Sequence, residues 1–585
     1  MPVIAERRRP ARFSRPAAPA RPAAAGPVQP FQCHVLRDTS KPVGRKSVTY
    51  YVTLALVRLA AAGAALGGGG RAQTVTLSPV FVTATRTTEA AGAVPFSHLV
   101  LSGDDLRAAP NASVDGALRD FPAFSLFRRS DSLVANPTTQ GVSLRGLGPS
   151  GASRSLVLLD GVPLNDPFGG WVLWSLVPRE SLARIELVPG GGGTAWGDAA
   201  LGGAIQLFTE PALGERERLA ARTGSFGTHD VELQATEPVG RGSVQVLGRY
   251  FSTDGFYVVA PEDRGSIDRP ASSRARWATA RWRQPLGPDV TATVTVRRFA
   301  EDRGNGTPYQ VNATDGTLAS VALDAQPSAA FRWNATAYAE AESYSSTFSS
   351  VNATRTAETP ASNQFAVPST ALGAAWVGEW SAADGSHTSF GVDARDVRGE
   401  TREDSAYVSG AFTRRRFAGG HQTIAGAFLE HSRALAGEAR LTAGLRADGW
   451  WESNGHRRDF LLGAPAGDTE YPDHDGTTLS PSAGVVWPAN RHLRLHVSGQ
   501  HAFRRPTLNE LYRPFRVGNV ITDANPDLRT ETVTTGEIGA TIDVGRGFPT
   551  TPGGGDAAGR RGRETPPYNH ASAFTFGLAA FDNEL

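Results

Sequence analysis

The second half of the chain alternates apolar and polar residues with a period of two. Within 441–448 the apolar positions Leu441, Ala443, Leu445 and Ala447 are separated by polar residues or glycine, and residues 290–297 and 493–498 follow the same rule. This alternation predicts strands with one apolar and one polar face. Many such segments, each of about ten residues, are typical of a transmembrane β-barrel with a polar interior.

Before Pro211 the pattern is different, with short apolar runs separated by glycine-rich turns. The runs at Ser155–Leu159, Arg184–Val188 and Ala204–Phe208 predict strands. Residues Asp104–Phe121 have helical spacing, and Ser113 is a suitable N-cap. This half therefore predicts a compact α+β unit.

Four motifs in this region identify a family resemblance. They occur in order as Leu144-Arg145-Gly146, Leu158–Pro163 (LLDGVP), Arg184–Glu186 (RIE) and Trp196–Ile205 (WGDAALGGAI). Their succession resembles the plug domain of TonB-dependent outer-membrane receptors. The resemblance implies a mainly β fold, in which an α+β plug lies inside a transmembrane antiparallel β-barrel of 22 strands. It also implies an outer-membrane location in a Gram-negative-type bacterium, and it is strongest to siderophore and cobalamin receptors.

Charge and composition divide the chain further. Residues 1–72 hold ten Arg, both Lys and only two acidic residues, and the remainder holds 47 basic and 55 acidic residues. We expect a disordered or mis-assigned extension at 1–40, a signal peptide at 41–72, a TonB-box segment at 73–87, the plug at 88–211 and the barrel at 212–585. A membrane anchor is the alternative for 41–72, although Arg58 interrupts its apolar run.

The segment behind the expected cleavage site is rich in residues that favour an extended chain. On the resemblance it holds the TonB box, which a TonB-type energy-coupling protein captures by adding a strand to its own sheet. An ordinary first strand or linker is the alternative. The box residues are Leu77, Ser78, Pro79, Val80, Phe81, Val82, Thr83 and Ala84.

Two plug arginines, Arg145 and Arg154, need acidic partners, because a guanidinium in a packed lumen must be paired. The resemblance implies partners on the inner barrel wall, and Glu531 and Glu537 are the candidates. We expect these pairs to hold the plug until the box is pulled. Static structural salt bridges are the alternative.

The expected apical plug loops combine aromatic and polar side chains, which is the composition of a ligand pocket. Packing against the barrel wall is the alternative for the aromatic residues. The segments Glu452–Thr478 and Arg513–Asp523 are expected to be external loops that capture the ligand. The candidate ligand-binding residues are Arg128, Arg129, Asn165, Asp166, Phe168, Trp171 and Trp174.

Several other functions are disfavoured. Gly146–Gly151 matches G-x-G-x-x-G, but a strand-like segment follows it where a dinucleotide site needs a helix. The sequence offers no nucleophile–base constellation and no metal quartet, and Asp473-His474-Asp475 is more typical of solvated charge than of a metal site. The net charge of about −8 beyond residue 72 argues against a nucleic-acid partner. We expect no enzyme activity, no cofactor and no resident metal.

The pattern contains about fifteen strand-like segments, fewer than the family's 22, so we expect a barrel that is incomplete at its C-terminus. The predicted function is TonB-dependent active transport of a ferric siderophore or cobalamin across the outer membrane by a monomer in contact with outer-membrane lipid. Carbohydrate uptake, a passive pore or adhesin, and a truncated non-functional receptor are the alternatives.

Overall fold

The structure is a computed structural model, which describes residues 81–82, 86, 89–90, 93–128, 130–148, 150–190, 192–435, 438–490, 492–517 and 520–542. All of them belong to one compact unit that spans Ser78–Leu585. The leader expected at 1–72 and the last segment of the expected barrel, from residue 543, lie outside the described residues. The predictions for those two segments therefore stay predictions.

The plug is built on a five-stranded sheet with the order β3-β8-β9-β6-β7. Strand β6 runs parallel to β9, and the other neighbours are antiparallel. The three predicted plug strands are confirmed as β6, β8 and β9. The bounds are β3 Leu99–Ser102, β6 Leu156–Leu159, β7 Val162–Pro163, β8 Leu182–Pro189 and β9 Gly203–Thr209, with a separate pair of β4 Phe124–Leu126 and β5 Val142–Leu144.

The predicted helix over Asp104–Phe121 is in fact two short helices. Helix α2 (Gly103–Ala108) is closed by a capping box between Ser102 and Asp105, and α3 (Val114–Leu118) begins at the predicted N-cap Ser113. Pro110 lies between them, where it removes a backbone donor that one continuous helix needs. The other short helices are α4 Gly193–Trp196, η2 Pro137–Thr139, η3 Trp174–Leu176 and η4 Arg179–Ser181.

The plug has its own hydrophobic core between the sheet and these helices. Leu118, Val157, Leu182 and Ile205 are fully buried, and Trp174 packs edge-on against Phe124 with ring centroids 6.0 Å apart. Burial of apolar area on this scale is the main stabilising term for such a unit. The plug is therefore a folded platform rather than a loose filling of the lumen.

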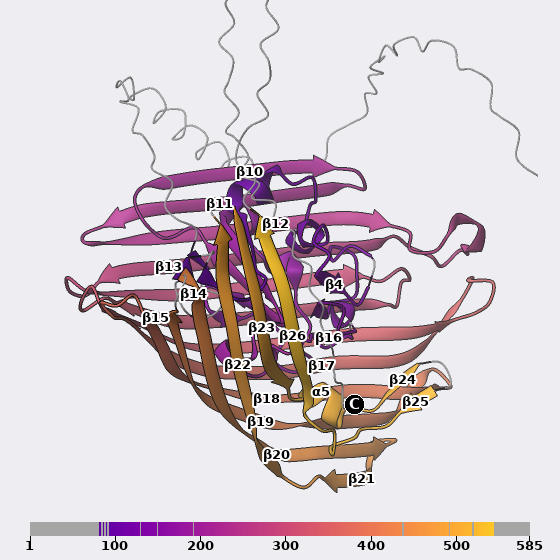
Figure 1. Ribbon diagram of the computed structural model, residues 1–585. Helices are drawn as coiled ribbons and strands as arrows, with labels where there is room; N and C mark the ends of the chain where they lie inside the picture. The colour runs from indigo at the N-terminus through magenta and orange to yellow at the C-terminus, as the bar shows by residue number, and fades with distance from the viewer. Residues whose placement is uncertain are drawn as a thin grey trace, which may run out of the picture. The chain divides into compact units, whose positions relative to one another are not determined.

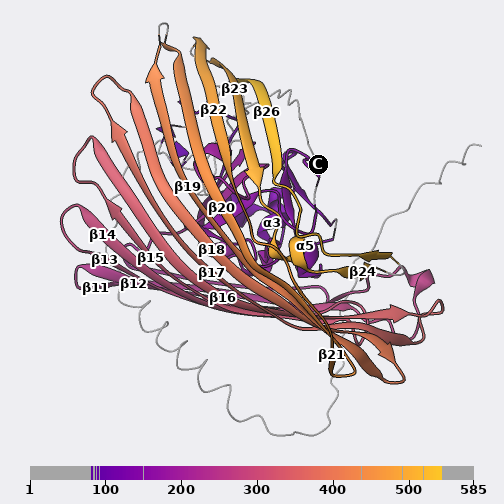
Figure 2. The same cartoon turned by 90° about the horizontal axis from the view of Figure 1, so that it is seen from below.

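The rest of the chain forms one antiparallel sheet of fifteen strands in the described residues. Figures 1 and 2 show the strands sweeping around the indigo and purple plug, which lies on the concave side. Consecutive strands pair from β10 to β20, then β22, β23 and β26, while β21 pairs with β20. The bounds are β10 Arg216–Gly224, β11 Thr228–Val239, β12 Gly242–Phe256, β13 Ala271–Pro285, β14 Val290–Gly304, β15 Val311–Ala325, β16 Phe331–Val351, β17 Glu358–Ser381, β18 His387–Val408, β19 Ala411–Ala434, β20 Arg440–Leu461, β21 Ala464–Glu470, β22 His474–Asn490, β23 Leu493–Arg504 and β26 Glu531–Ile542.

The two faces of this sheet reverse the arrangement of a water-soluble protein. Val296 and Leu445 on the outer face are 46% and 51% exposed, whereas their neighbours Arg297 and Arg446 on the inner face are buried. An apolar outer face and a polar inner face are the arrangement that a lipid-facing barrel wall requires. The predicted alternation is thus confirmed in both period and direction.

The two ends of the sheet differ in their connections. At the end where the chain passes from the plug into β10, short turns occupy 240–241, 286–289, 326–330 and 382–386. We call this the entry end, because the chain enters the barrel sheet there. At the opposite end a longer connection, with the short helix η5 (Pro261–Asp263), spans residues 257–270. The edge strands β10 and β26 are not paired with each other in the described residues.

Two expectations about the outer segments are corrected. Most of Glu452–Thr478 is strand, because β20 runs on to Leu461 and turns through β21 into β22. Part of Arg513–Asp523 is also strand, as β24 (Phe515–Val517) pairs with β25 (Val520–Thr522). The composition of residues 452–461 is that of a loop, and it is pairing with β19 and β21 that holds them in the extended hairpin. No helix in the described residues is both long and apolar enough to cross a membrane.

Candidate functional site at the interface of plug and barrel

The first charge contact between plug and barrel joins Arg145 to Glu537. Arg145 follows β5 and has a left-handed backbone with φ 54°, which is uncommon outside glycine. Glu537 of β26 accepts hydrogen bonds from the Arg145 guanidinium and from the Ser97 backbone N, 3.1 Å away, and its Oε1 lies 3.0 Å from His496 Nε2. The Glu537 side chain is 2% exposed. Its charge is therefore compensated from both the plug and the wall.

The second contact joins Arg154 to Glu531, at the start of β26. Arg154 Nε and Nη2 donate to the two Glu531 oxygens at 2.8 and 3.2 Å, which is a bidentate pair. Arg504 of β23 also donates to Glu531 at 2.7 Å and to Glu510 at 2.8 and 2.9 Å. Glu510 belongs to α5 (Leu508–Tyr512) and closes its capping box with Thr507. Through Arg504, the contact of the plug with β26 extends to α5, a segment outside the barrel sheet.

The structure thus brings together the four residues proposed for a plug–barrel lock, in the pairs Arg145–Glu537 and Arg154–Glu531. Arg145 and Arg154 come from the segment around the first motif, and both glutamates come from one strand. The geometry is that of ion pairs largely removed from water. Their role in holding the plug until it is pulled stays a proposal.

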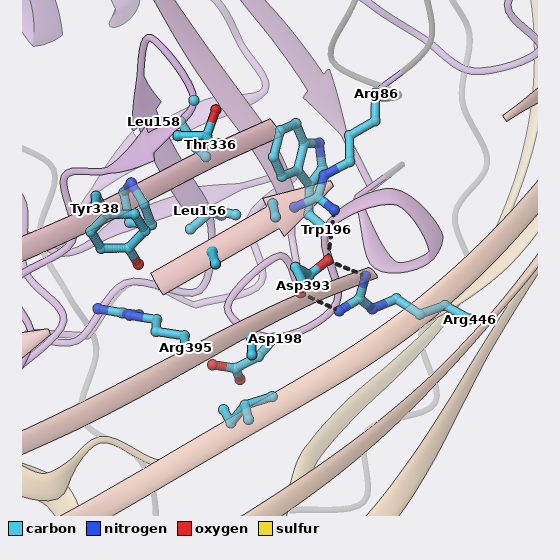
Figure 3. Close-up of a pocket in the computed structure, with 16 residues that line it drawn as sticks. Arg86, Leu156, Leu158, Trp196, Asp198, Thr336, Tyr338, Asp393, Arg395 and Arg446 are labelled. Carbon is cyan, nitrogen blue, oxygen red and sulfur yellow. Dashed lines mark hydrogen bonds and ion pairs between the residues drawn. The ribbon is translucent and has the colours of Figure 1, made fainter. Parts of the chain in front are cut away.

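A third contact, which the sequence analysis did not predict, is made by Arg86 (Figure 3). Its Nη1 donates to Asp393 Oδ2 of β18 at 2.6 Å, and its guanidinium lies 4.2 Å from the centre of the Trp196 ring. Arg446 of β20 holds the same Asp393 with two hydrogen bonds of 2.8 Å and also binds Asp448. Arg86 lies two residues after Ala84, the last residue of the predicted TonB box.

Because the Arg86 guanidinium is buried, its charge depends on the Asp393 carboxylate as a partner. Removal from water lowers the pKa of Arg86, and the Asp393 carboxylate opposes that shift. A guanidinium without its carboxylate at this position is costly, because a buried charge needs a partner. Arg86 therefore fixes the start of the plug to the barrel wall.

Next to this contact lies a cavity of about 80 Å³ between the plug and the barrel. Plug residues Leu158 and Trp196 line one side, and Thr336, Tyr338 and Arg395 line the other. Figure 3 shows Arg395 beside Tyr338, away from the Arg86–Asp393 pair. The interface is thus partly charged, partly polar and incompletely filled.

Arginines of β12–β14 also point inward and contact the plug. Arg281 of β13 donates to Asp160 of the LLDGVP turn at 2.6 Å, and Arg249 of β12 donates to the Ser175 backbone O at 2.8 Å. Arg303 of β14 donates to the Ser132 backbone O at 2.6 Å. Asp160 was quoted in the motif, but its partner lies 121 positions away and could not be read from local spacing.

The candidate ligand residues at Asn165–Trp174 are buried. Asn165 bonds the backbone of Val157 and Ser155, and Asp166 accepts from the backbone N of Phe168 and Gly169. Trp174 belongs to the plug core, while Phe168 and Trp171 pack with barrel residues such as Tyr344. These side chains are packed in the interior, as in the alternative given in the sequence analysis. A role in ligand contact would need them to become exposed.

The remaining predicted residues are placed as follows. Arg128 is exposed, and Arg129 lies outside the described residues. Of the predicted TonB box, the structure describes Phe81–Val82, which form β1 and pair with β2 (Glu89–Ala90). The other box residues, Leu77, Ser78, Pro79, Val80, Thr83 and Ala84, lie outside the described residues.

The Asp473-His474-Asp475 segment makes ordinary protein contacts. Asp473 accepts from the Asn454 backbone N at 3.2 Å, and His474 Nε2 lies 3.4 Å from Asp527. Over the described ranges, no group of three His, Cys, Asp or Glu residues has a geometry that would hold a metal ion.

Two protein-family descriptions match the chain. Residues 259–558 match the TonB dependent receptor-like β-barrel, and residues 91–204 match the TonB-dependent receptor plug domain. The chain belongs to the TonB-dependent receptor family. The resemblance inferred from the four motifs is confirmed, and the family consists of receptors and transporters rather than enzymes.

Two named relatives and one solved structure resemble this receptor. The vitamin B12 transporter BtuB of Vibrio vulnificus is 25% identical over 185 residues, and an iron-regulated outer membrane virulence protein of Vibrio cholerae is 25% identical over 485 residues. These alignments cover 31% and 78% of this chain, but only 29% and 64% of the relatives. The ferric yersiniabactin uptake receptor FyuA of Yersinia pestis has the same fold, with a TM-score of 0.60 at 14% identity over 77% of this chain and 70% of that chain.

Proposed function

We propose that this receptor carries a scarce ligand, an iron chelate or a corrinoid, across the outer membrane of a Gram-negative-type bacterium. A TonB-type coupling protein supplies the energy by pulling on the segment at Leu77–Ala84. One observation carries the proposal: the plug is held to the barrel wall by ion pairs, and the first of them, Arg86–Asp393, directly follows the segment that is pulled. The names of the two relatives support the ligand class.

The order of the contacts suggests how a pull acts on the plug. Force on the TonB box reaches Arg86 before any other described plug–barrel ion pair, because it is the first along the chain. Removing one partner of a buried pair costs about 3–5 kcal/mol, and the two hydrogen bonds that Asp393 keeps from Arg446 hold the loss of Arg86 near the lower figure. Arg145 and Arg154 lie about sixty positions further on and release afterwards. The plug then rearranges in steps rather than all at once.

Strand addition fits the box segment. Strand β1 has one neighbour, β2, in the two-stranded sheet that they form. A coupling protein can add its own strand to the free edge of β1 or take the place of β2. The proposed mechanism needs one copy of the chain, and we propose that the receptor acts as a monomer.

Growth on limiting nutrients tests the proposal. The chain is produced in a host without its own receptors and supplied with cyanocobalamin, a neutral trihydroxamate ferric chelate, a trianionic tris-catecholate ferric chelate, or a scarce oligosaccharide. We expect growth on the first or one of the two chelates, and loss of growth when Leu77–Ala84 is replaced by a Gly-Ser segment of equal length. A host that lacks the coupling protein is the control and must behave like the replaced chain.

The other outcomes identify the alternatives. Growth on the oligosaccharide alone makes the protein a carbohydrate receptor. Growth that survives both the replacement and loss of the coupling protein makes it a passive pore. Absence of stable protein from the outer membrane makes the chain a non-functional receptor.

A further inference from the structure

The plug is held unevenly around the inner wall. Hydrogen bonds and ion pairs join it to β12–β14 through Arg249, Arg281 and Arg303. Others join it to Arg505, directly after β23, and to Glu531 and Glu537 of β26. On α4, Thr194 Oγ1 also donates to the Ser480 backbone O of β22 at 2.9 Å. These two sectors seal the plug on both sides.

Between them, the half of β16 nearest the entry end lines two cavities instead. The cavity of about 80 Å³ includes Thr336 and Tyr338, and a second cavity of about 470 Å³ includes Arg332 and Asn334. In the described part of the chain, the structure records no hydrogen bond or ion pair from the plug to these four residues. Polar contacts therefore do not join the plug to the wall along this stretch, which we call the unsealed stretch, although Tyr338 packs against the apolar cluster that includes Phe168 and Trp171.

The two cavities follow one another along a single face of β16. Side chains two residues apart share a face of a strand, so Arg332, Asn334, Thr336 and Tyr338 all point to the lumen. At 3.3 Å per residue they span roughly 20 Å along the strand, which is roughly 15 Å along the barrel axis for strands tilted by about 35–45°, or about three fifths of the roughly 25 Å apolar band. The larger cavity lies at the entry end, and the smaller one lies against the plug beside Arg86.

Incomplete closure of the sheet does not create this stretch. Strands β16 and β17 lie in the middle of the strand order, with five or more strands between them and either edge, β10 or β26. Both neighbours of β16, β15 and β17, are paired along its length. The unsealed stretch is thus a property of the packing between plug and wall.

The lining of the stretch is polar, and its excess negative charge lies in the larger cavity. The smaller cavity has Asp198 and Asp393 against three arginines, Arg86, Arg395 and Arg446, and its charges balance once Arg86 has left. Thr291, Asn334, Thr336 and Tyr338 supply hydroxyl and amide groups. Arg332 is paired with Glu379, whereas no ion pair is recorded in the described residues for Asp289 or Asp324. Carboxylates that line a passage repel anions and favour neutral or cationic solutes.

The geometry points to a permeation route for a neutral or cationic ligand along the inner faces of β14–β17. The ligand passes after Arg86 has released and before the Arg145 and Arg154 pairs to β26 are broken, so the plug is still attached to β22–β26 at that stage. The inference rests on the proposed transport function and deepens it. Release of Arg86 enlarges the smaller cavity, because Arg86 and Trp196 form part of its lining. The smaller cavity then opens into the larger one.

Cysteine labelling tests the route without any ligand. Cys33 is the only cysteine of the chain, so a Cys33→Ser background accepts single reporters. Asn334→Cys and Thr336→Cys are compared with Ser482→Cys, which lies buried on the inner face of β22 near Thr194. In proteoliposomes with the entry end facing outward, a small cationic maleimide should label position 334 in the resting chain, position 336 once Arg86→Ala is added, and position 482 in neither chain. Equal labelling of all three positions, or none at 336 in the Arg86→Ala chain, overturns the route.

Filling the smaller cavity tests its use in transport. Thr336→Trp places an indole in the route, whereas Ala337→Trp places it on the exposed outer face one residue away. Uptake of cyanocobalamin or of the neutral trihydroxamate ferric chelate should be lost in Thr336→Trp and kept in Ala337→Trp, with surface binding kept in both. Uptake that continues in a folded Thr336→Trp chain contradicts the route.

Failure of the proposed transport function and failure of the permeation route give different results. When the unaltered chain takes up none of the compounds, the proposed function fails, and the labelling result still decides whether the passage exists. When it takes up only the trianionic chelate, transport stands and the charge preference inferred from Asp289 and Asp324 is wrong.

Discussion

The ion pair of Arg145 and Glu537 gives a prediction at the scale of single residues. Arg145→Ala leaves Glu537, 2% exposed, with only Ser97 and His496 as partners. Leaving a buried charge partly unpaired costs about 3–5 kcal/mol, and the two remaining partners keep the loss near the lower figure. This loss is measured by unfolding the plug in urea and monitoring its resistance to protease.

The control for that prediction is a surface pair of the same chemistry. Arg458 and Asp468 are 48% and 67% exposed in the far hairpin of β20 and β21, so Arg458→Ala should cost less than about 1 kcal/mol. Equal losses in both variants would mean that the Arg145 contact contributes no more than a solvated pair.

A pH-dependent contact joins two loops at the far end of the sheet. Asp268, between β12 and β13, accepts hydrogen bonds from Arg355, between β16 and β17, and the Arg355 guanidinium lowers the pKa of Asp268 to about 2. A carboxyl whose pKa falls on folding stabilises the protein above its unfolded pKa of about 3.9 and loses this effect as pH falls through the folded value. The loops should therefore stay joined at pH 5–7 and separate as pH falls from about 4 to 2.

Spin labels measure that separation. Ser266→Cys and Thr354→Cys are exposed positions in the two loops, and their distance should lengthen in the acidic range only. With Asp268→Asn added, the distance should not depend on pH. A pH-independent distance in the chain that keeps Asp268 would show that Arg355 is not what joins the loops.

At the scale of elements, one glycine fixes the end of the β8–β9 pair. Gly203 begins β9 with φ 119°, and a methyl group there would lie 2.1 Å from the Val188 backbone O. Gly203→Ala should lower plug stability by at least about 1–3 kcal/mol, the cost of holding a non-glycine residue in such a conformation. Gly499→Ala is the control, since its nearest new contact is 3.8 Å. The urea midpoints of the two variants should differ clearly.

The elements were predictable to the extent that their signals are local. Alternation over residues 441–448 sets the faces of β20, and glycine pairs mark the turns of the plug. Pro110, which divides the expected helix, was also visible but was outweighed by the helical spacing around it. The length of β20 was not predictable, because residues 452–461 have the polar composition of a loop and pair only through β19 and β21.

The candidate site also contains contacts that the sequence could predict and contacts that it could not. Arg145 and Arg154 could be paired with Glu531 and Glu537, since few acidic residues lie in that last strand region. Asp393 could not be assigned to Arg86, because 307 positions separate them and many inward positions of the barrel carry charge. The aromatic residues Phe168 and Trp171 have the composition of a pocket or of a core, and only packing distinguishes the two.

At the scale of the whole molecule, the exposed apolar face determines where the protein resides. Val296, Leu372, Leu445 and Val497 are 46–54% exposed on the outer face of the sheet, which in water would favour association. In a bilayer the same face lies against lipid. Membrane insertion and the polar lumen are therefore two consequences of one alternating pattern.

Charge placed on that face gives the last prediction. Leu445 and Leu461 both belong to β20, are 51% and 49% exposed, and differ in position along the strand. Leu445→Arg, level with the inward Arg446 and within the apolar band, should weaken folding into phospholipid vesicles by about 2–4 kcal/mol, whereas Leu461→Arg, at the far hairpin, should cost about 0–1 kcal/mol. Urea titration of the vesicle-bound chain measures both values. A depth-independent cost would mean that this face does not lie against lipid, and the transport proposal would lose its physical basis.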